Sequence, residues 1–483
     1  MAATPSPPPT HQLPNILHPH TLSGERAVHV PPLQRRRPSK AAPHTAYRLL
    51  AGACILVTLA LLAWGASQGK PLAIGLVAVP VVMALAYPVL ARYCREERTF
   101  DLLGIVYLGL ALRFVGSYYR FTIAADAKSY YRYGVQFADS FRNFDFAVDL
   151  GRPVPGTGSV RWFSALVVVF TGPNIYLEFV VFTLIAFSGM LLFYRAFTTA
   201  FPNGDRKRYA LLLFLWPSMA FWPSSIGKES LMMFGIGLAS YGASRMFTHR
   251  PLGMAALAGG LAVLALIRPH MSLIVIVGVG VAYLFVRSTR GSLWLSGGKI
   301  LAIAVLLIGG AIIATQTAEF LKLDDFGQDQ LDVVAQSTSD RTAQGGAEFT
   351  PIRADSSPVL FPAAVASVLF RPLPFEAHNQ DSLIAAAEGL LLVAITAASW
   401  RRLARLPGRI IREPYVAYAV SMVLLFCFVF SVIANFGILT RQRTQVLPLY
   451  FVLLAIPAAR EVASATREPR QRPTLLTDPP RAT

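Results

Sequence analysis

The sequence has few charged residues. Only 14% of its 483 residues are Asp, Glu, Lys or Arg, whereas 54% are hydrophobic, and an average soluble protein carries about 25% charged residues. Repeated apolar stretches have the length that an α-helix needs to cross a hydrocarbon layer of about 30 Å. The short alternating segments of a membrane β-barrel are absent. These features predict an all-α, polytopic integral membrane protein.

Several motifs are also missing. The three cysteines, Cys54, Cys94 and Cys427, lie in or beside apolar segments and form neither a disulfide framework nor a zinc motif. No Walker loop or dinucleotide fingerprint occurs, which argues against ATP drive and a soluble nucleotide donor. The formal net charge of +18 does not indicate nucleic acid, because the basic residues form short runs between apolar segments.

The two ends of the chain differ in composition from the rest. Residues 1–46 contain ten prolines and five histidines but few large apolar residues, so we expect a disordered cytoplasmic arm rather than a cleaved signal. Residues 461–483 are similarly polar, and we expect a disordered cytoplasmic tail. The transmembrane domain is predicted to occupy residues 47–460.

The apolar segments predict about twelve transmembrane helices. They begin near residues 48, 72, 101, 174, 209, 229, 252, 271, 299, 381, 414 and 446. The distribution of Lys and Arg orients these helices in the cell membrane with both termini in the cytoplasm. The two long loops, residues 119–173 and 317–380, then lie on the extracytoplasmic side. The short apolar segment 161–171 is expected to lie along the outer interface or dip into it.

Four polar clusters fall at this predicted outer face, where charged side chains are costly and therefore usually paired or functional. In the first cluster, Asp126 and Tyr130 are four residues apart and share one helical face. The carboxylate could serve as general base for a sugar hydroxyl, with the tyrosine positioning the sugar. Alternatively, Asp126 caps a short helix or pairs with Lys128.

The second cluster is Lys228 and Glu229, which follow a Trp-Pro-Ser turn at the start of a predicted span. The free N–H groups of a helix start favour an anion. The simpler interpretation is a helix start whose charges are solvated among the headgroups.

The third cluster is Arg268 and His270, in a turn with almost no polar connection between two apolar helices. The guanidinium could hold a phosphate through two parallel hydrogen bonds, and His270 could donate another or shuttle a proton. A snorkelling arginine bound to a lipid headgroup is the alternative.

The fourth cluster is Arg441 and Arg443, just before the last predicted span. Both are candidates to hold a phosphate, and Arg371 and Arg113 could join them; Arg113 lies inside a span, where charge is rarely incidental. One acid with several cations at the level of the headgroups suits a lipid-phosphate substrate. The outer histidines, His270 and His378, are too few to predict a metal site.

These residues resemble the GT-C type of membrane glycosyltransferase, including bacterial relatives of protein mannosyltransferases and lipopolysaccharide-core sugar transferases. The resemblance covers residues 48 to 460 and rests on Asp126 with Tyr130, on Lys228-Glu229, and on the Gly-x-x-x-Arg-x-Arg-x-x-x-x-Pro pattern before the last span. It implies transfer of a sugar from a polyprenyl-phosphate carrier to a cell-envelope acceptor, usually with inversion.

By the same resemblance, Asp126 would be the catalytic base, and Arg268, Arg441 and Arg443 would hold the carrier phosphate. The family often has paired acids in the first loop and a large soluble C-terminal domain. Here Ala125 precedes Asp126 and no such domain follows, so the acceptor and any divalent cation stay open.

Three other functions remain open. A polysaccharide repeat-unit polymerase would depend more on arginines than on a carboxylate. A flippase or other transporter of lipid-linked sugars would place charges along a route through the membrane, and a scaffold protein would bind partners through its long loops. The expected partners are the lipid-linked sugar, its glycan, lipid or protein acceptor, and membrane lipids.

Overall fold

The computed structural model describes residues 45–286, 348–354, 357–377 and 379–457, together with the isolated positions 307, 308 and 311. Regular structure in these residues is helical, apart from one isolated β-bridge between Glu348 and Asn435. The predicted all-α fold class is therefore confirmed for the part of the chain that is described.

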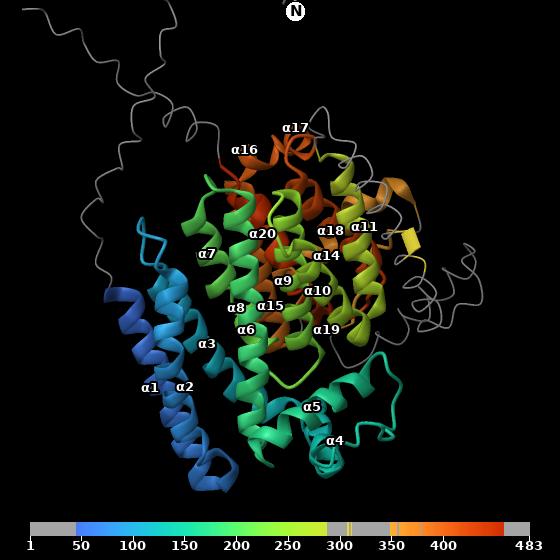
Figure 1. Ribbon diagram of the computed structural model, residues 1–483. Helices are drawn as coiled ribbons and strands as arrows, with labels where there is room; N and C mark the ends of the chain where they lie inside the picture. Colours follow the sequence, from blue (N-terminus) through green and yellow to red (C-terminus); the bar gives the residue numbers. More distant parts are fainter. Residues whose placement is uncertain are drawn as a thin grey trace, which may run out of the picture. The chain divides into compact units, whose positions relative to one another are not determined.

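The first half of the described chain runs through the helices α1 to α11 (Figure 1). Their bounds are α1 Thr45–Gln68, η1 Lys70–Leu72, α2 Gly75–Cys94, α3 Leu102–Ile123, α4 Ala125–Arg142, α5 Thr157–Thr171, α6 Ile175–Ala200, α7 Arg206–Leu215, α8 Pro217–Phe221, α9 Lys228–Phe247, α10 Gly253–Ile267 and α11 Pro269–Leu284.

The second half contains shorter helices around one long one. Their bounds are η2 Pro358–Leu360, α14 Phe361–Phe370, η3 Pro374–Glu376, α15 Gln380–Ala398, α16 Trp400–Leu403, α17 Leu406–Ile410, α18 Pro414–Phe430, α19 Phe436–Arg443 and α20 Leu447–Ala455.

Among the described residues, five helices are long and apolar enough to cross a membrane, which indicates a membrane protein. They are α1, α2, α3, α6 and α15, with candidate spans Ala46–Gln68, Gly75–Cys94, Leu102–Ile123, Ile175–Ala200 and Gln380–Ala398. The helices α5, α10, α11 and α18 are apolar but shorter. The helices α7, α9 and α20 begin within three residues of three further predicted starts. The total of twelve spans remains a prediction.

Some predictions concern residues outside the described ranges. These are nearly all of the N-terminal arm 1–46, the tail 461–483, nearly all of the span predicted to start near residue 299, and much of the loop 317–380, including His378. The described part of that loop contains a short apolar helix, Pro358–Phe370, that we did not predict.

The predicted loop 119–173 is largely helical. Helix α3 continues to Ile123, and α4 and α5 follow and pack against each other, as Figure 1 shows in teal. Along α4, polar residues alternate with the buried side chains of Tyr130, Phe137 and Phe141, the pattern of a helix half covered by its neighbours. Helix α4 therefore carries the first polar cluster, with Asp126 in its first turn.

Close helix contacts surround α9. A Cβ atom added at Gly189 of α6 would collide with the carbonyl oxygen of Met233, and one added at Gly237 of α9 would collide with the carbonyl oxygen of Gly189. Small residues allow membrane helices to approach at backbone distance. The contact holds α6 against α9, the helix that carries Glu229 in its first turn.

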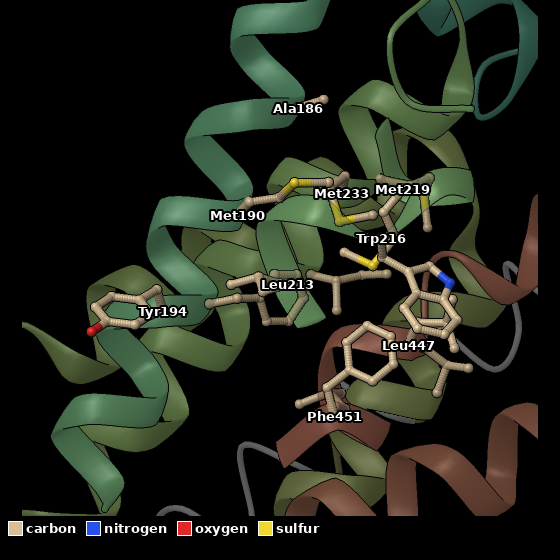
Figure 2. Packing of buried hydrophobic residues seen from close by; sticks show 14 of the residues in the cluster. Ala186, Met190, Tyr194, Leu213, Trp216, Met219, Met233, Leu447 and Phe451 are labelled. Atoms are coloured by element: carbon tan, nitrogen blue, oxygen red, sulfur yellow. The ribbon is translucent and has the colours of Figure 1, made fainter. Parts of the chain in front are cut away.

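The core beside α6 and α9 is aromatic and sulfur-rich. Figure 2 shows Met219 and Met233 near Trp216 and Met190 farther away on α6, with the ring of Phe451 of α20 next to the ring of Trp216. The centroids of these two rings are 5.0 Å apart. Trp216 thereby joins the α7–α8 corner to the last described helix, an arrangement that also orients the indole N–H group discussed below.

Candidate functional site

A chain of charged side chains joins three distant segments. Nη2 of Arg441, in the last turn of α19, lies 2.9 Å from Oδ2 of Asp126 at the start of α4, and 2.7 Å from Oε2 of Glu229 at the start of α9. The Glu229 side chain is only 4% exposed, whereas that of Asp126 is 36% exposed. One guanidinium therefore binds a buried carboxylate and an accessible one.

Arg268 extends this chain. Its Nη2 atom lies 3.5 Å from Oε1 of Glu229, and its Nη1 atom donates to Oε1 of Gln442. The same amide oxygen of Gln442 accepts a 2.6 Å hydrogen bond from Nε2 of Gln445. The turn between α10 and α11 is thus tied to α9 and to α19, and Gln442 links it further to the segment after α19.

Arg120 and two aromatic rings complete one side of the cluster. Nη2 of Arg120, near the end of α3, lies 3.9 Å from Oδ1 of Asp126. The Arg120 guanidinium lies 5.1 Å from the ring centroid of Trp222 and 5.5 Å from that of Phe221, and the Arg441 guanidinium lies 5.9 Å from the Trp222 centroid. Cation–π contacts at these distances stabilise a positive charge where water is scarce.

Burial and the neighbouring charges together determine the pKa values of Arg441 and Tyr130. Burial by itself lowers the pKa of Arg441, but Glu229 and Asp126 outweigh burial, so its pKa is raised and the guanidinium stays charged. Tyr130, one turn along α4 from Asp126, has a raised pKa, first because it is buried and then because Asp126 and Glu229 repel the phenolate. Tyr130 is therefore a neutral hydroxyl beside both carboxylates.

The cluster carries an excess of positive charge. Lys228, the first residue of α9, interacts electrostatically with Glu229, Arg268 and Arg441. Four cations, Arg120, Lys228, Arg268 and Arg441, thus face two carboxylates, which leaves a net charge of +2 in this cluster. An anion such as a phosphate group would neutralise that excess by taking the place of a carboxylate on one of the arginines.

A cavity of about 510 Å³ is lined in part by the same two aromatic rings. Its wall includes Trp222 and Phe221, which contact the charged cluster, and Asp381 and Glu388 of α15. Tyr119 of α3 and Ile384 of α15 also line the cavity and are more than half exposed. A ligand in the cavity would therefore share an aromatic contact with Arg120 and Arg441.

Arg443 has a different environment from Arg441, although both were predicted to hold a phosphate. Its Nη1 atom donates to the carbonyl oxygens of Leu369, at 2.7 Å, and Arg371, at 3.0 Å, and its Nη2 atom lies 3.8 Å from Oε1 of Glu388. These partners anchor α19 to the end of α14 and to α15. Arg443 lines the cavity rather than joining the charge chain through Arg441.

The remaining predicted site residues also lie apart from that chain. Arg371 pairs with Glu376 and stacks on Phe349. Arg113 lies nearly three turns before the end of α3 and donates to the carbonyl oxygens of Gly109 and Phe214. Its charge is met by backbone oxygens within the helix packing, which explains its burial without a ligand.

Two expectations about individual residues can be compared with the geometry. Asp126 neither caps α4, since Ala124 is the N-cap residue, nor pairs with Lys128, whose Nζ atom lies 3.4 Å from the carbonyl oxygen of Thr122. His270 lies in the first turn of α11, with its ring centroid 6.1 Å from that of Phe430.

Sequence reasoning missed Arg120, Gln442 and Glu388. Glu388 accepts hydrogen bonds from Nε1 of Trp216 and the backbone N–H of Ser218, both at 2.8 Å. A carboxylate in the middle of an apolar helix was a usable signal, because its insertion is costly unless it is paired. Arg120 gave the same signal near the end of α3, whereas Gln442 gave none.

Within the described ranges, no group of three His, Cys, Asp or Glu side chains could hold a metal ion. No family model, curated protein or solved structure matches the chain.

Proposed function

We propose that the chain is a membrane glycosyltransferase that moves a sugar from a polyprenyl-phosphate carrier to a cell-envelope acceptor on the extracytoplasmic side. The observation that carries the proposal is the bridge from Asp126 through Arg441 to Glu229 and Arg268, with its excess positive charge, beside a cavity. The four residues come from distant segments, and the sequence predicts each of them as a site residue: Asp126 as the base, Arg268 and Arg441 as ligands of the phosphate, and Glu229 as part of a substrate-binding turn.

The geometry supports a simple exchange. The donor phosphate binds Arg441 and Arg268, and the Asp126 carboxylate is released from Arg441 because the phosphate competes for the same N–H groups. Asp126 then accepts the proton of an acceptor hydroxyl. The acceptor oxygen bonds to the anomeric carbon, the bond from that carbon to the phosphate oxygen breaks, and polyprenyl phosphate leaves with its charge held by the arginines. Glu229 stays buried and keeps both arginines in place.

The test uses the full chain in liposomes with radiolabelled polyprenyl-phosphate hexoses and pentoses. We expect label to move to an acceptor in a membrane extract, and the Asp126→Asn variant to slow transfer by about 100-fold or more, the usual contribution of a general base. Asp139→Asn is the matched control, because Asp139 is an exposed acid on the same helix, paired with Arg142.

Two results would contradict the proposal. If the wild-type chain consumes none of these donors, the chain is not this transferase, and the transporter and scaffold hypotheses gain support. If transfer occurs but Asp126→Asn leaves its rate within threefold, Asp126 is not the base.

A repeat-unit polymerase is the second candidate. The net charge of +2 in the cluster suits a diphosphate-linked donor at least as well as a monophosphate-linked one. In that case Arg268 and Arg441 carry the reaction, so Arg441→Gln should abolish chain growth while Asp126→Asn preserves it. Asp126→Asn therefore separates the two activities, whereas Arg441→Gln should abolish both, because Arg441 binds the donor phosphate in each.

A further inference from the structure

The cavity next to the charged cluster has the opposite charge balance. Its lining includes two carboxylates, Asp381 and Glu388, and one guanidinium, Arg443. The charged cluster, which contacts the same rings of Trp222 and Phe221, has a net charge of +2 instead. A phosphate is therefore attracted to the cluster and repelled by the cavity, so the two spaces favour different ligands.

The cavity wall combines flat rings with hydrogen-bonding groups. Tyr119, Phe221 and Trp222 present aromatic surface, and Asp381, in the first turn of α15, brings an exposed carboxylate to the same space. Aromatic faces with a few polar groups are the usual lining of a site for a small organic ligand. Carboxylates accept hydrogen bonds from hydroxyl groups, and they are costly to bury against hydrocarbon alone.

From these observations we propose that the cavity binds the acceptor of the transfer reaction, and that this acceptor is a neutral, hydroxyl-rich glycan. The role of this glycan as the acceptor rests on the proposed function, whereas the binding of a glycan follows from the lining of the cavity. In this arrangement the glycan contacts Trp222, whose ring the Arg120 and Arg441 guanidinium groups also contact, and its reactive hydroxyl extends past the ring to Asp126, which pairs with both arginines.

The test measures glycan binding without requiring transfer. The full chain is placed in phosphatidylcholine nanodiscs, free of glycosidic detergents, and mixed separately with maltotriose, mannotriose, cellotriose and xylotriose. Saturation-transfer NMR reports binding. We expect at least one trisaccharide to bind with millimolar affinity, and Asp381→Asn to weaken its binding by about tenfold.

Two neighbouring alanines of α15 supply a matched pair of variants. Ala385 lines the cavity, whereas Ala387 is exposed and is not part of its wall. Ala385→Trp should fill the cavity and abolish trisaccharide binding, and Ala387→Trp should leave binding unchanged. Binding of decaprenyl phosphate provides the second arm: Ala385→Trp should preserve it, and Arg441→Gln should weaken it.

The outcomes are separable. The proposal is overturned if no trisaccharide binds, if Ala385→Trp and Ala387→Trp bind equally well, or if Ala385→Trp instead removes decaprenyl phosphate, which would assign the cavity to the lipid. If trisaccharides bind as expected but no donor sugar is ever transferred, the glycan site stands and the transferase function fails.

Discussion

The bond between Arg441 and Glu229 should be one of the strongest charge couplings in the described part of the chain. The two atoms are 2.7 Å apart and the carboxylate is nearly inaccessible. With an effective dielectric constant of about 20, two unit charges at this distance attract by about 6 kcal/mol. Desolvation and side-chain ordering remove a large part of this energy, so we expect a net coupling of about 2 to 3 kcal/mol.

A double-mutant cycle measures this coupling. The variants are Arg441→Gln, Glu229→Gln and the double variant, and the quantity is the free energy of unfolding in mixed micelles titrated with sodium dodecyl sulfate. The parallel cycle of Arg441 with Asp126 should give about 1 kcal/mol or less, because Asp126 is more than a third exposed and solvent screens it.

The exposed pair of Asp139 and Arg142 serves as the reference, for which we expect about 0 to 0.5 kcal/mol. A coupling below about 0.5 kcal/mol for Arg441 with Glu229 would refute the reasoning. It would mean that Glu229 is not needed to hold Arg441, and that the charge chain is not a preformed site.

Two further predictions concern the scaffold. Glu388→Ala leaves the indole N–H of Trp216, the N–H of Ser218 and the charge of Arg443 without this partner. We therefore expect the free energy of unfolding to fall by about 3 to 5 kcal/mol. A fall below about 1 kcal/mol in the same micelle titration would contradict the assigned bonds. Gly237→Val should destabilise the chain by about 1 to 3 kcal/mol because α6 and α9 touch there. Gly52→Val, with open space around it, should have little effect, and equal losses in the two variants would count against that contact.

The sequence by itself determined the helical membrane class and the starts of most described helices. In a bilayer, the backbone N–H and C=O groups of a long apolar run can form their hydrogen bonds only within a helix. The starts of α1, α2, α3, α6 and α15 therefore followed from the apolar runs and the polar residues between them. It also selected Asp126, Glu229, Arg268 and Arg441, because charge among apolar residues is costly and its presence requires a partner.

Only the tertiary structure decided which partner each charge has. Arg441 and Arg443 are two residues apart, and their spacing gave both the same expected role. In α19 they point to different neighbours: Arg441 to Asp126 and Glu229, and Arg443 to backbone oxygens and Glu388. Pairings across hundreds of residues depend on how helices pack, and local pattern carries no information about that packing.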